Sequence, residues 1–247
     1  MTRPASRSEG LTGRLRDLGA DVETRPTISL EPPSDPGPAR RAVSELDRYD
    51  WILFTSANGV KFFQALVAKL HAEDFRIHAA IGAIGPATAR ELERSGHRPS
   101  VVAEDARSEG LARSLADKVR PGERVLVVRP EVARPILLDA LGEIGARVDA
   151  VAFYRNVPAP DVRALAAEVC ADRFDVVILT SPSTVQHLLG AAQGWADDVR
   201  AALGRTRLVA IGPVTARAIE QAGLTPASVA AQPTDEAISQ AVRSLFD

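Results

Sequence analysis

The stretch AIGPATARELERSGHRPSVVAE, residues 83–104, returns without gaps as AIGPVTARAIEQAGLTPASVAA at residues 210–231. The two copies are identical at 12 of 22 positions, so the chain contains a duplicated unit. In each copy an apolar run leads into Gly-Pro, and a later glycine, Gly96 or Gly223, ends the pattern. Proline in the first turn and glycine just past the last turn are typical of a helix. Each copy therefore predicts a strand that is followed directly by a helix.

A second matched pair lies upstream of the two copies. YDWILFTSANGV at residues 49–60 matches FDVVILTSPSTV at residues 174–185. The runs WILFT and VVILT are short and apolar, as in strands buried on both faces of a parallel sheet, and small polar residues and a helical pattern follow each run. From the serine of this segment to the glycine of the Gly-Pro pair there are 29 residues in one half and 31 in the other. Both halves therefore predict one strand–loop–helix architecture.

These repeats assign the chain to two α/β domains. One is continuous and spans residues 38–150. The other is discontinuous and combines residues 1–28 with residues 160–247, so the chain crosses between domains twice. Proline-rich linkers at 29–37 and 151–159 are expected to act as semi-rigid spacers. Helices of the continuous domain are expected near 38–48, 57–70, 86–95, 108–119 and 133–144, with further strands at 124–128 and 147–153.

Composition excludes several classes of function. The net charge of −2 gives no overall field that would attract nucleic acid, and the four histidines lack metal-ligand spacing. No apolar stretch approaches the roughly 20 residues of a membrane span, and the N-terminus resembles no secretory signal. The single cysteine, Cys170, is expected to be a small buried hydrophobe in an amphipathic helix. We therefore expect a protein of the reducing cytoplasm with no metal, no nucleic-acid partner and no membrane contact.

Taken together, these motifs resemble the uroporphyrinogen-III synthase family. The likeness rests on Thr2-Arg3-Pro4, on FTSANGV and LTSPSTV after strands, on the paired IGPxTA motifs, and on FYRNV in the second linker. Each motif alone is weak, because small residues after strands are common in α/β folds. Their order, spacing and duplication along nearly the whole chain make the match specific. The resemblance implies two flavodoxin-like parallel-sheet domains joined by a two-stranded linker, with an active cleft between them.

The same resemblance implies the reaction and the substrate. The family closes hydroxymethylbilane, a linear chain of four pyrroles with acetate and propionate groups, into uroporphyrinogen III without a cofactor. Loss of the hydroxyl as water leaves an electrophilic azafulvene, and a spiro intermediate then recloses with the last ring inverted. Without the enzyme the substrate closes to the symmetrical isomer, so we expect catalysis to depend largely on conformational steering. A monomer is implied as well.

One element is missing at the start of the discontinuous domain. By analogy with residues 50–55 leading into 57–70, this domain should begin with an apolar strand, yet little chain precedes a helix predicted near residues 8–18. In a flavodoxin-like sheet the first strand is internal, so its loss would leave two neighbouring strands with unpaired backbone groups. We therefore expect a translation start further upstream, or a poorly stable domain if these 247 residues are the whole protein.

Candidate substrate-binding residues lie where parallel strands end and helices begin. Such loops present free backbone N–H groups and a favourable dipole to carboxylates. The alternative is that the hydroxyl groups only cap the helices. The candidates in the two repeats are Thr55, Ser56, Asn58, Gly85 and Thr88 in the continuous domain, and Thr180, Ser181, Ser183, Gly212 and Thr215 in the discontinuous domain.

Two further binding candidates follow from the resemblance. Arg134 matches a basic residue of the family's strand-to-helix turn, and Ser108 matches a small polar residue that opens the next helix. The sequence departs from the family here, because VRPEVAR stands where a glycine-containing loop is more common, and Pro130 removes a backbone donor. Arg134 is either a carboxylate clamp or an exposed ion-pairing residue. Lys61 and Arg155 are weaker candidates.

Tyr154 is the candidate catalytic residue. It aligns with the tyrosine that the family places at the cleft beside the linker, and a phenol keeps its proton at neutral pH, so it could assist departure of the hydroxyl as an acid. The alternative is a tyrosine that only packs between the domains. A competing function for the whole chain is a non-catalytic, two-lobed module that binds carboxylates or senses tetrapyrroles.

Overall fold

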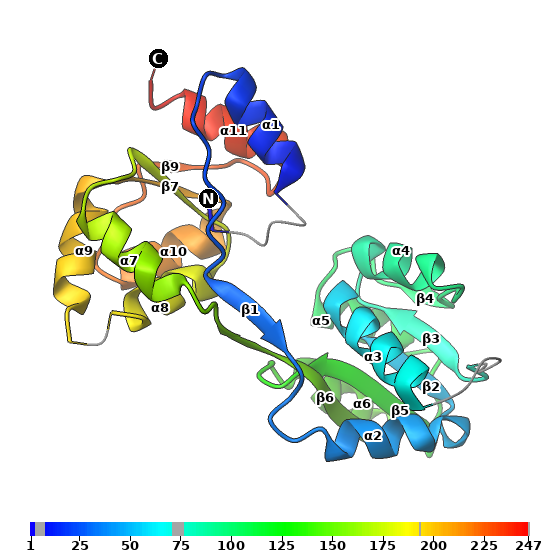
Figure 1. The fold of residues 1–247 in the computed structure, drawn as a ribbon. Helices are drawn as coiled ribbons and strands as arrows, with labels where there is room; N and C mark the ends of the chain where they lie inside the picture. Colours follow the sequence, from blue (N-terminus) through cyan, green and yellow to red (C-terminus); the bar gives the residue numbers. More distant parts are fainter. Residues whose placement is uncertain (3–7, 71–76, 193, 247) are drawn as a thin grey trace. The chain divides into compact units, whose positions relative to one another are not determined.

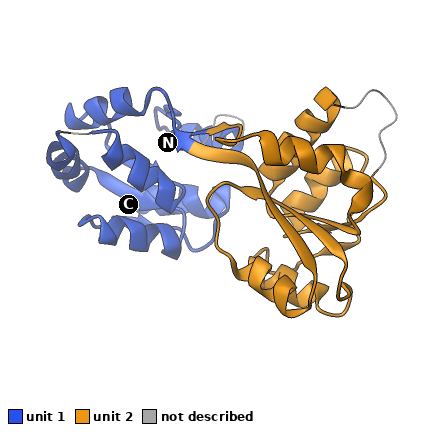
Figure 2. Ribbon diagram, turned by 90° about the horizontal axis from the view of Figure 1, so that it is seen from below, with its two compact units in different colours: residues 1–29, 157–247 blue, residues 30–156 orange. Residues whose placement is uncertain are grey.

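The computed structural model describes residues 1–2, 8–70, 77–192 and 194–246, which form two compact units (Figures 1 and 2). The continuous unit is Leu30–Asn156, and the discontinuous unit combines Met1–Ser29 with Val157–Asp247. Both boundaries fall within strands, so two strands carry the chain from one unit to the other. Within the described ranges no helix is long and apolar enough to cross a membrane.

Strands β2 to β6 are parallel and form most of the sheet of the continuous unit. The order is β1-β6-β5-β2-β3-β4, and every neighbouring pair from β6 to β4 is parallel. The α/β class predicted from the repeats is therefore confirmed. The strands are β1 (Ile28–Glu31), β2 (Trp51–Phe54), β3 (Ala80–Ala83), β4 (Val101–Val102), β5 (Arg124–Pro130) and β6 (Arg147–Pro158). The helices are α2 (Gly37–Ser44), the short 3-10 helix η2 (Leu46–Arg48), α3 (Ala57–Leu70), α4 (Pro86–Arg94), α5 (Ser108–Leu115) and α6 (Ile136–Glu143).

Apolar side chains cover both faces of this sheet. All four residues of β2 are buried. Ile52 and Phe54 pack in one cluster with side chains of α2, α3 and α4, such as Phe63, whereas Leu53 packs in a second cluster with α5 and α6, for example against Leu111. This alternation explains the continuous apolar run in the sequence, because a parallel strand between two helix layers has no polar face. The carboxyl ends of the strands remain as the edge where a ligand can bind.

The discontinuous unit repeats this design with a shorter sheet. Its strands are β7 (Val176–Leu179), β8 (Arg207–Ala210) and β9 (Ser228–Val229), paired in parallel in that order. Its helices are α1 (Glu9–Asp17), α7 (Val162–Cys170), α8 (Pro182–Gly190), α9 (Ala196–Arg205), α10 (Pro213–Gln221) and α11 (Asp235–Arg243). The segments β7–α8 and β8–α10 match β2–α3 and β3–α4, as the sequence repeat predicts.

The first two residues of the chain hydrogen-bond to both of their neighbours in this unit. The backbone N–H and the hydroxyl of Thr2 donate to the carbonyl of Ile178 in β7, at 3.3 and 2.8 Å. On the other side Arg25 N donates to Met1 O at 2.8 Å, and Thr27 N donates to Thr2 O at 3.4 Å. Our expectation that these neighbours would lack backbone partners is therefore wrong, because Met1 and Thr2 supply them.

The start of the chain is equivalent to β5, not to β2. In the discontinuous unit the spatial order is 25–27, 1–2, β7, β8 and β9, which is the flavodoxin order. These segments correspond to β6, β5, β2, β3 and β4, so the chain enters the same order at a different strand in the continuous unit. The sequence agrees, because IGARVD at 144–149 resembles LGADVE at 18–23. The glycines of these segments, Gly145 and Gly19, have φ of 83° and 86° just after α6 and α1, where a helix end needs the left-handed region. The two units are thus circularly permuted copies.

Candidate active site

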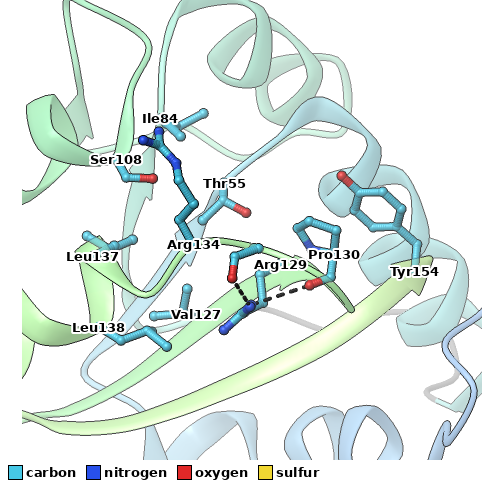
Figure 3. A pocket seen from close by; sticks show the side chains of 11 residues that line it. Thr55, Ile84, Ser108, Val127, Arg129, Pro130, Arg134, Leu137, Leu138 and Tyr154 are labelled. Carbon is cyan, nitrogen blue, oxygen red and sulfur yellow. Dashed lines mark hydrogen bonds between the residues drawn. The ribbon is translucent and has the colours of Figure 1, made fainter. Parts of the chain in front are cut away.

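A pocket lies at the carboxyl ends of the strands of the continuous unit (Figure 3). Its apolar lining comes from Ile84, Val127, Leu137 and Leu138. Its polar lining comes from Thr55, Ser108, Arg129, Arg134 and Tyr154, four of which are residues that the sequence nominated. Apolar walls with a few converging polar groups are typical of a small-molecule site. This lining fits a flat apolar group that carries an anionic substituent.

The side chain of Tyr154 is held in place along its whole length. The residue is 5% exposed. Its hydroxyl oxygen lies 2.9 Å from Ser56 Oγ, and its ring stacks on Phe62 with centroids 5.5 Å apart and planes at 20°. The backbone carbonyl of Tyr154 accepts a 2.8 Å hydrogen bond from Glu131 N. Both its ring and its hydroxyl therefore have fixed positions at the pocket wall.

A β-bulge in β6 produces this orientation. The register between β5 and β6 shifts next to Pro130, so that Pro130 lies opposite Tyr154 and Phe153 is the extra residue. Neighbouring residues of a regular strand point to opposite faces. Here Phe153 contacts Phe63, at 5.5 Å between ring centroids, while Tyr154 stacks on Phe62, so both face helix α3. Pro130, which has no N–H for a regular ladder, stands where the register shifts and also lines the pocket.

The loop between β2 and α3 contributes hydroxyl groups in two different ways. Thr55 lines the pocket and donates its own hydroxyl to the carbonyl of Val128 at 2.9 Å, which leaves its oxygen able to accept. Ser56 Oγ accepts a 2.9 Å hydrogen bond from Gly59 N in the first turn of α3 and contacts Tyr154. Asn58 lies in the same first turn. The capping alternative is thus observed for Ser56, together with a contact to the candidate catalytic residue.

Two arginines belong to the pocket. Arg134 precedes α6, and its side chain is 68% exposed and 3.4 Å from Glu109 Oε1. Exposed pairs of this kind are weak, so Arg134 is free to exchange this partner for another carboxylate. Arg129, which the sequence reading missed, donates to the carbonyls of Ala133 at 2.9 Å and Pro130 at 3.3 Å (Figure 3). A basic residue at the end of the apolar run VLVV was the available signal.

The two Gly-Pro motifs differ in their surroundings. A Cβ on Gly85 would lie 2.6 Å from Ala106 Cβ, whereas a Cβ on Gly212 would meet nothing within 4 Å among the described atoms. The threonines of the two motifs are buried, with Thr88 3% and Thr215 2% exposed. Gly85 therefore has a packing role. Substrate contacts by these four residues stay predictions.

The hydroxyl groups of the discontinuous unit form a helix cap. Ser181 Oγ accepts from Thr184 N and its own N–H donates to Thr184 Oγ1, both at 3.3 Å, which is the reciprocal arrangement of a capping box. Ser183 Oγ lies 3.0 Å from Ser181 Oγ, and Thr180 directly follows β7. The capping alternative is again observed here, and a role in substrate binding is untested.

A polar network lies beside Tyr154 on the next residue of β6. Arg155 pairs with Glu31 at 2.9 Å and donates to Ser34 Oγ at 3.1 Å. Ser34 in turn donates its backbone N–H and its hydroxyl to Glu131, and these hydrogen bonds hold the pKa of Glu131 below its usual range. This network fixes Glu131, whose N–H binds the carbonyl of Tyr154. Arg155 is therefore a structural residue in this state of the protein.

The remaining candidates lie away from the pocket lining. Lys61 is 4.0 Å from Glu91 on α4. Cys170 packs against the core of the discontinuous unit but is only partly buried there, so the expectation of a small buried hydrophobe is confirmed in part. Among the residues that the structure describes, no group of three His, Cys, Asp or Glu could hold a metal ion.

Similar proteins were found over almost the whole chain. The family model for uroporphyrinogen-III synthase HemD matches residues 9–240. A relative from Methanothermobacter thermautotrophicus is 30% identical over 228 residues, which cover 91% of this chain and 89% of the relative. The uroporphyrinogen-III synthase of Synechococcus elongatus is 28% identical over 219 residues, which cover 87% of this chain and 82% of that protein.

Solved structures share the fold. A mutant uroporphyrinogen III synthase from the extremely thermophilic bacterium Thermus thermophilus superimposes with a TM-score of 0.65 at 24% identity, covering 98% of this chain and 96% of that chain. The enzyme from Helicobacter pylori gives a TM-score of 0.59 at 20% identity, with 92% and 94% covered. Because the family model spans nearly the whole sequence, this chain belongs to the uroporphyrinogen-III synthase family.

Proposed function

We propose that the pocket of the continuous unit binds part of hydroxymethylbilane and that Tyr154 assists the loss of its hydroxyl. The family makes uroporphyrinogen III in tetrapyrrole biosynthesis, and its members are cyclising lyases. The observation that carries the site proposal is the meeting at one pocket of Thr55, Ser108, Arg134 and Tyr154, which come from four separate segments of the sequence.

The lining of the pocket matches the chemistry of this substrate. Each pyrrole is a flat apolar ring, which suits the walls formed by Leu137 and Leu138. Each ring also carries acetate and propionate groups, for which Arg134 and the hydroxyl of Ser108 are suitable donors. Arg134 has to exchange a weak contact with Glu109 for a substrate carboxylate, which costs little at an exposed position.

Tyr154 supplies the proton in the first chemical step of this proposal. The phenol proton moves to the hydroxyl oxygen of the substrate, the C–O bond breaks, and water leaves. The pyrrole nitrogen supplies the electron pair, so the products of this step are an azafulvenium cation and a tyrosinate. The tyrosinate later takes up the proton that is released when the last pyrrole regains aromaticity, which restores Tyr154 for the next turnover.

Rigid packing supports the steering of the ring closure. The substrate closes unaided to the symmetrical isomer, so an enzyme must hold the reacting ends in the geometry that leads to the inverted ring. The bulge in β6, the stacking on Phe62 and the hydrogen bond from Glu131 to Tyr154 fix one wall of the pocket for this purpose.

An isomer assay tests the proposed function. Freshly generated hydroxymethylbilane is added to the protein, the products are oxidised, and the type I and type III isomers are separated by chromatography. We expect type III above the level without enzyme, and less of it in Arg134→Ala. Arg94→Ala is the matched control, because Arg94 is also a highly exposed arginine, 70% against 68%, paired with a glutamate and absent from the pocket lining.

The same assay separates the synthase from a non-catalytic binding module. Type I product alone, from a sample that unfolds cooperatively, would contradict the synthase and favour a protein that only binds the tetrapyrrole. The family match and the named relatives support the synthase instead. Contacts by the remaining nominated residues, a monomeric state and a cytoplasmic location stay predictions.

A further inference from the structure

We propose that Ser56 is a positioning residue for the reaction: its hydroxyl donates to the phenol oxygen of Tyr154, turns the phenol proton away from itself, and stabilises the tyrosinate after proton transfer. This inference rests on the acid role of Tyr154 described above. In this proposal Ser56 acts through Tyr154 and does not bind a substrate carboxylate.

The hydrogen-bonding capacity of Ser56 carries the argument. Its Oγ accepts from Gly59 N at 2.9 Å, so its single proton remains to be donated. Within the described part of the chain, the acceptor placed for that proton is the hydroxyl of Tyr154, at 2.9 Å. If Tyr154 donated instead, its proton would point at Ser56 and would not be available to a substrate. Donation by Ser56 directs the phenol proton away from Ser56.

Ser56 is held by the local backbone. It lies between β2 and α3, and its Oγ caps the first turn of α3 through Gly59. That turn packs closely on β5, because a Cβ on Gly59 would lie 3.2 Å from Val128 Cγ1 and 3.3 Å from Ser56 Oγ. Phe62 of the same helix stacks on the ring of Tyr154. One helix therefore sets both the plane of the ring and the hydrogen bond to its oxygen.

The contact gains strength during the proposed step. After the proton leaves Tyr154, Ser56 donates to a negatively charged oxygen, and hydrogen bonds to charged acceptors are about twice as strong as neutral ones. The interaction is therefore worth more after proton transfer than before, which is the condition for an effect on kcat. Return of the proton to the tyrosinate restores the neutral pair.

A spectroscopic titration tests this proposal without any turnover. The chain has two tyrosines, Tyr49 and Tyr154, so a Tyr49→Phe protein grown with a fluorotyrosine that ionises near neutral pH carries one fluorine label. We expect Ser56→Ala to raise the titration midpoint of the label by about one pH unit, because a donor to the ionised form is lost. An unchanged or lowered midpoint would overturn the proposal.

Two controls keep this measurement interpretable. Ser181→Ala removes the corresponding serine cap from the discontinuous unit and is expected to leave the midpoint unchanged. If Tyr49→Phe is poorly folded, the label is read with Tyr49 present, because burial and the hydrogen bond to Asp149 raise the pKa of Tyr49 and separate the two titrations. Ser56→Thr, which keeps a hydroxyl, is expected to restore the midpoint.

Kinetics provide the second readout. Ser56→Ala is expected to lower kcat about tenfold with little change in KM, and to have no further effect in a Tyr154→Phe background. Additive losses, or a rise confined to KM, would show that Ser56 acts on the substrate directly and would overturn its role through Tyr154. Full kcat in Tyr154→Phe would instead refute the proposed acid, whereas an unchanged fluorine midpoint refutes the role of Ser56 alone.

Discussion

Of the two variants Gly85→Ala and Gly212→Ala, only Gly85→Ala is expected to be less stable than the wild type. Both glycines have φ of 173°, an extended conformation that alanine can adopt, so the gain from a stiffer unfolded chain is about 0.4–1 kcal/mol in each case. The new methyl groups differ in their contacts. At Gly85 the Cβ would lie 2.6 Å from Ala106 Cβ and 3.0 Å from Ala106 Cα, whereas at Gly212 no atom of the described residues lies within 4 Å of it.

The structure sets the size of the difference. Carbon atoms pack at about 3.5–4.0 Å, so the loop at Ala106 would have to move by about 1 Å. Ala106 already has a φ of 49°, in the left-handed region, which restricts that movement. Overpacking of this kind costs about 1–3 kcal/mol. After the gain in the unfolded chain, we expect Gly85→Ala to lose about 0.5–2 kcal/mol and Gly212→Ala to be unchanged or slightly stabilised.

Tryptophan fluorescence can follow the urea unfolding of the two units separately, because each unit contains one tryptophan. Trp51 lies in the continuous unit and Trp195 in the discontinuous unit. Gly85→Ala is measured in a Trp195→Phe background by the fluorescence of Trp51, and Gly212→Ala is measured in the converse background. Equal losses in the two variants, or full stability in Gly85→Ala, would refute the packing argument. A raised KM in a stable Gly212→Ala would support close approach of the substrate there.

Three further outcomes are expected from single replacements. Arg134→Ala should raise KM about tenfold, because one charge-assisted hydrogen bond to the substrate is lost, whereas Arg94→Ala should leave KM unchanged. Equal KM values in the two variants would show that Arg134 does not bind a substrate carboxylate. Tyr154→Phe should lower kcat about a hundredfold without abolishing type III product, and a folded but inactive variant would contradict this. Glu131 has a lowered pKa when folded, so its contribution to stability is complete above its ordinary value of 4.5 and is lost as the pH falls through the folded value. The difference in unfolding free energy between wild type and Glu131→Gln should therefore shrink in acid, and a difference that grows would contradict the network with Ser34.

The repeated elements could be predicted from the sequence because their signals are local. The apolar run at 51–55 contains β2, and the Gly-Pro pairs open α4 and α10 where the sequence predicts helix starts. Burial on both faces of the sheet requires a continuous apolar run, and such a run is readable without knowing the partner strands. The pocket residue Thr55 was found on the same basis, since it directly follows a strand, whereas Ser108 was nominated through the family resemblance.

The surroundings of Tyr154 could not be predicted in this way. Ser56 lies 98 residues before Tyr154, and the regular alternation of a strand would place Phe153 and Tyr154 on opposite faces. The bulge that brings both to one face depends on the register with β5 at Pro130. Register is a property of two strands together, so a single segment contains no signal for it.

The error at the N-terminus has a topological cause. We compared the start of the chain with β2, because both precede a helix. The structure makes it equivalent to β5, and the short segment Met1–Thr2 supplies the backbone hydrogen bonds of an internal position. The permutation hides this relation, because the matching segments stand at opposite ends of the two copies.

The hydrogen bonds of Thr2 also impose an order on biosynthesis. Its partner Ile178 is synthesised 176 residues later, a delay of about 10–35 s at roughly 5–20 residues per second. Meanwhile Leu30–Asn156 emerges as an uninterrupted stretch with its own sheet and two apolar clusters. The continuous unit of the nascent chain can therefore fold first, whereas Met1–Ser29 can pair with β7 only after β7 has left the ribosome.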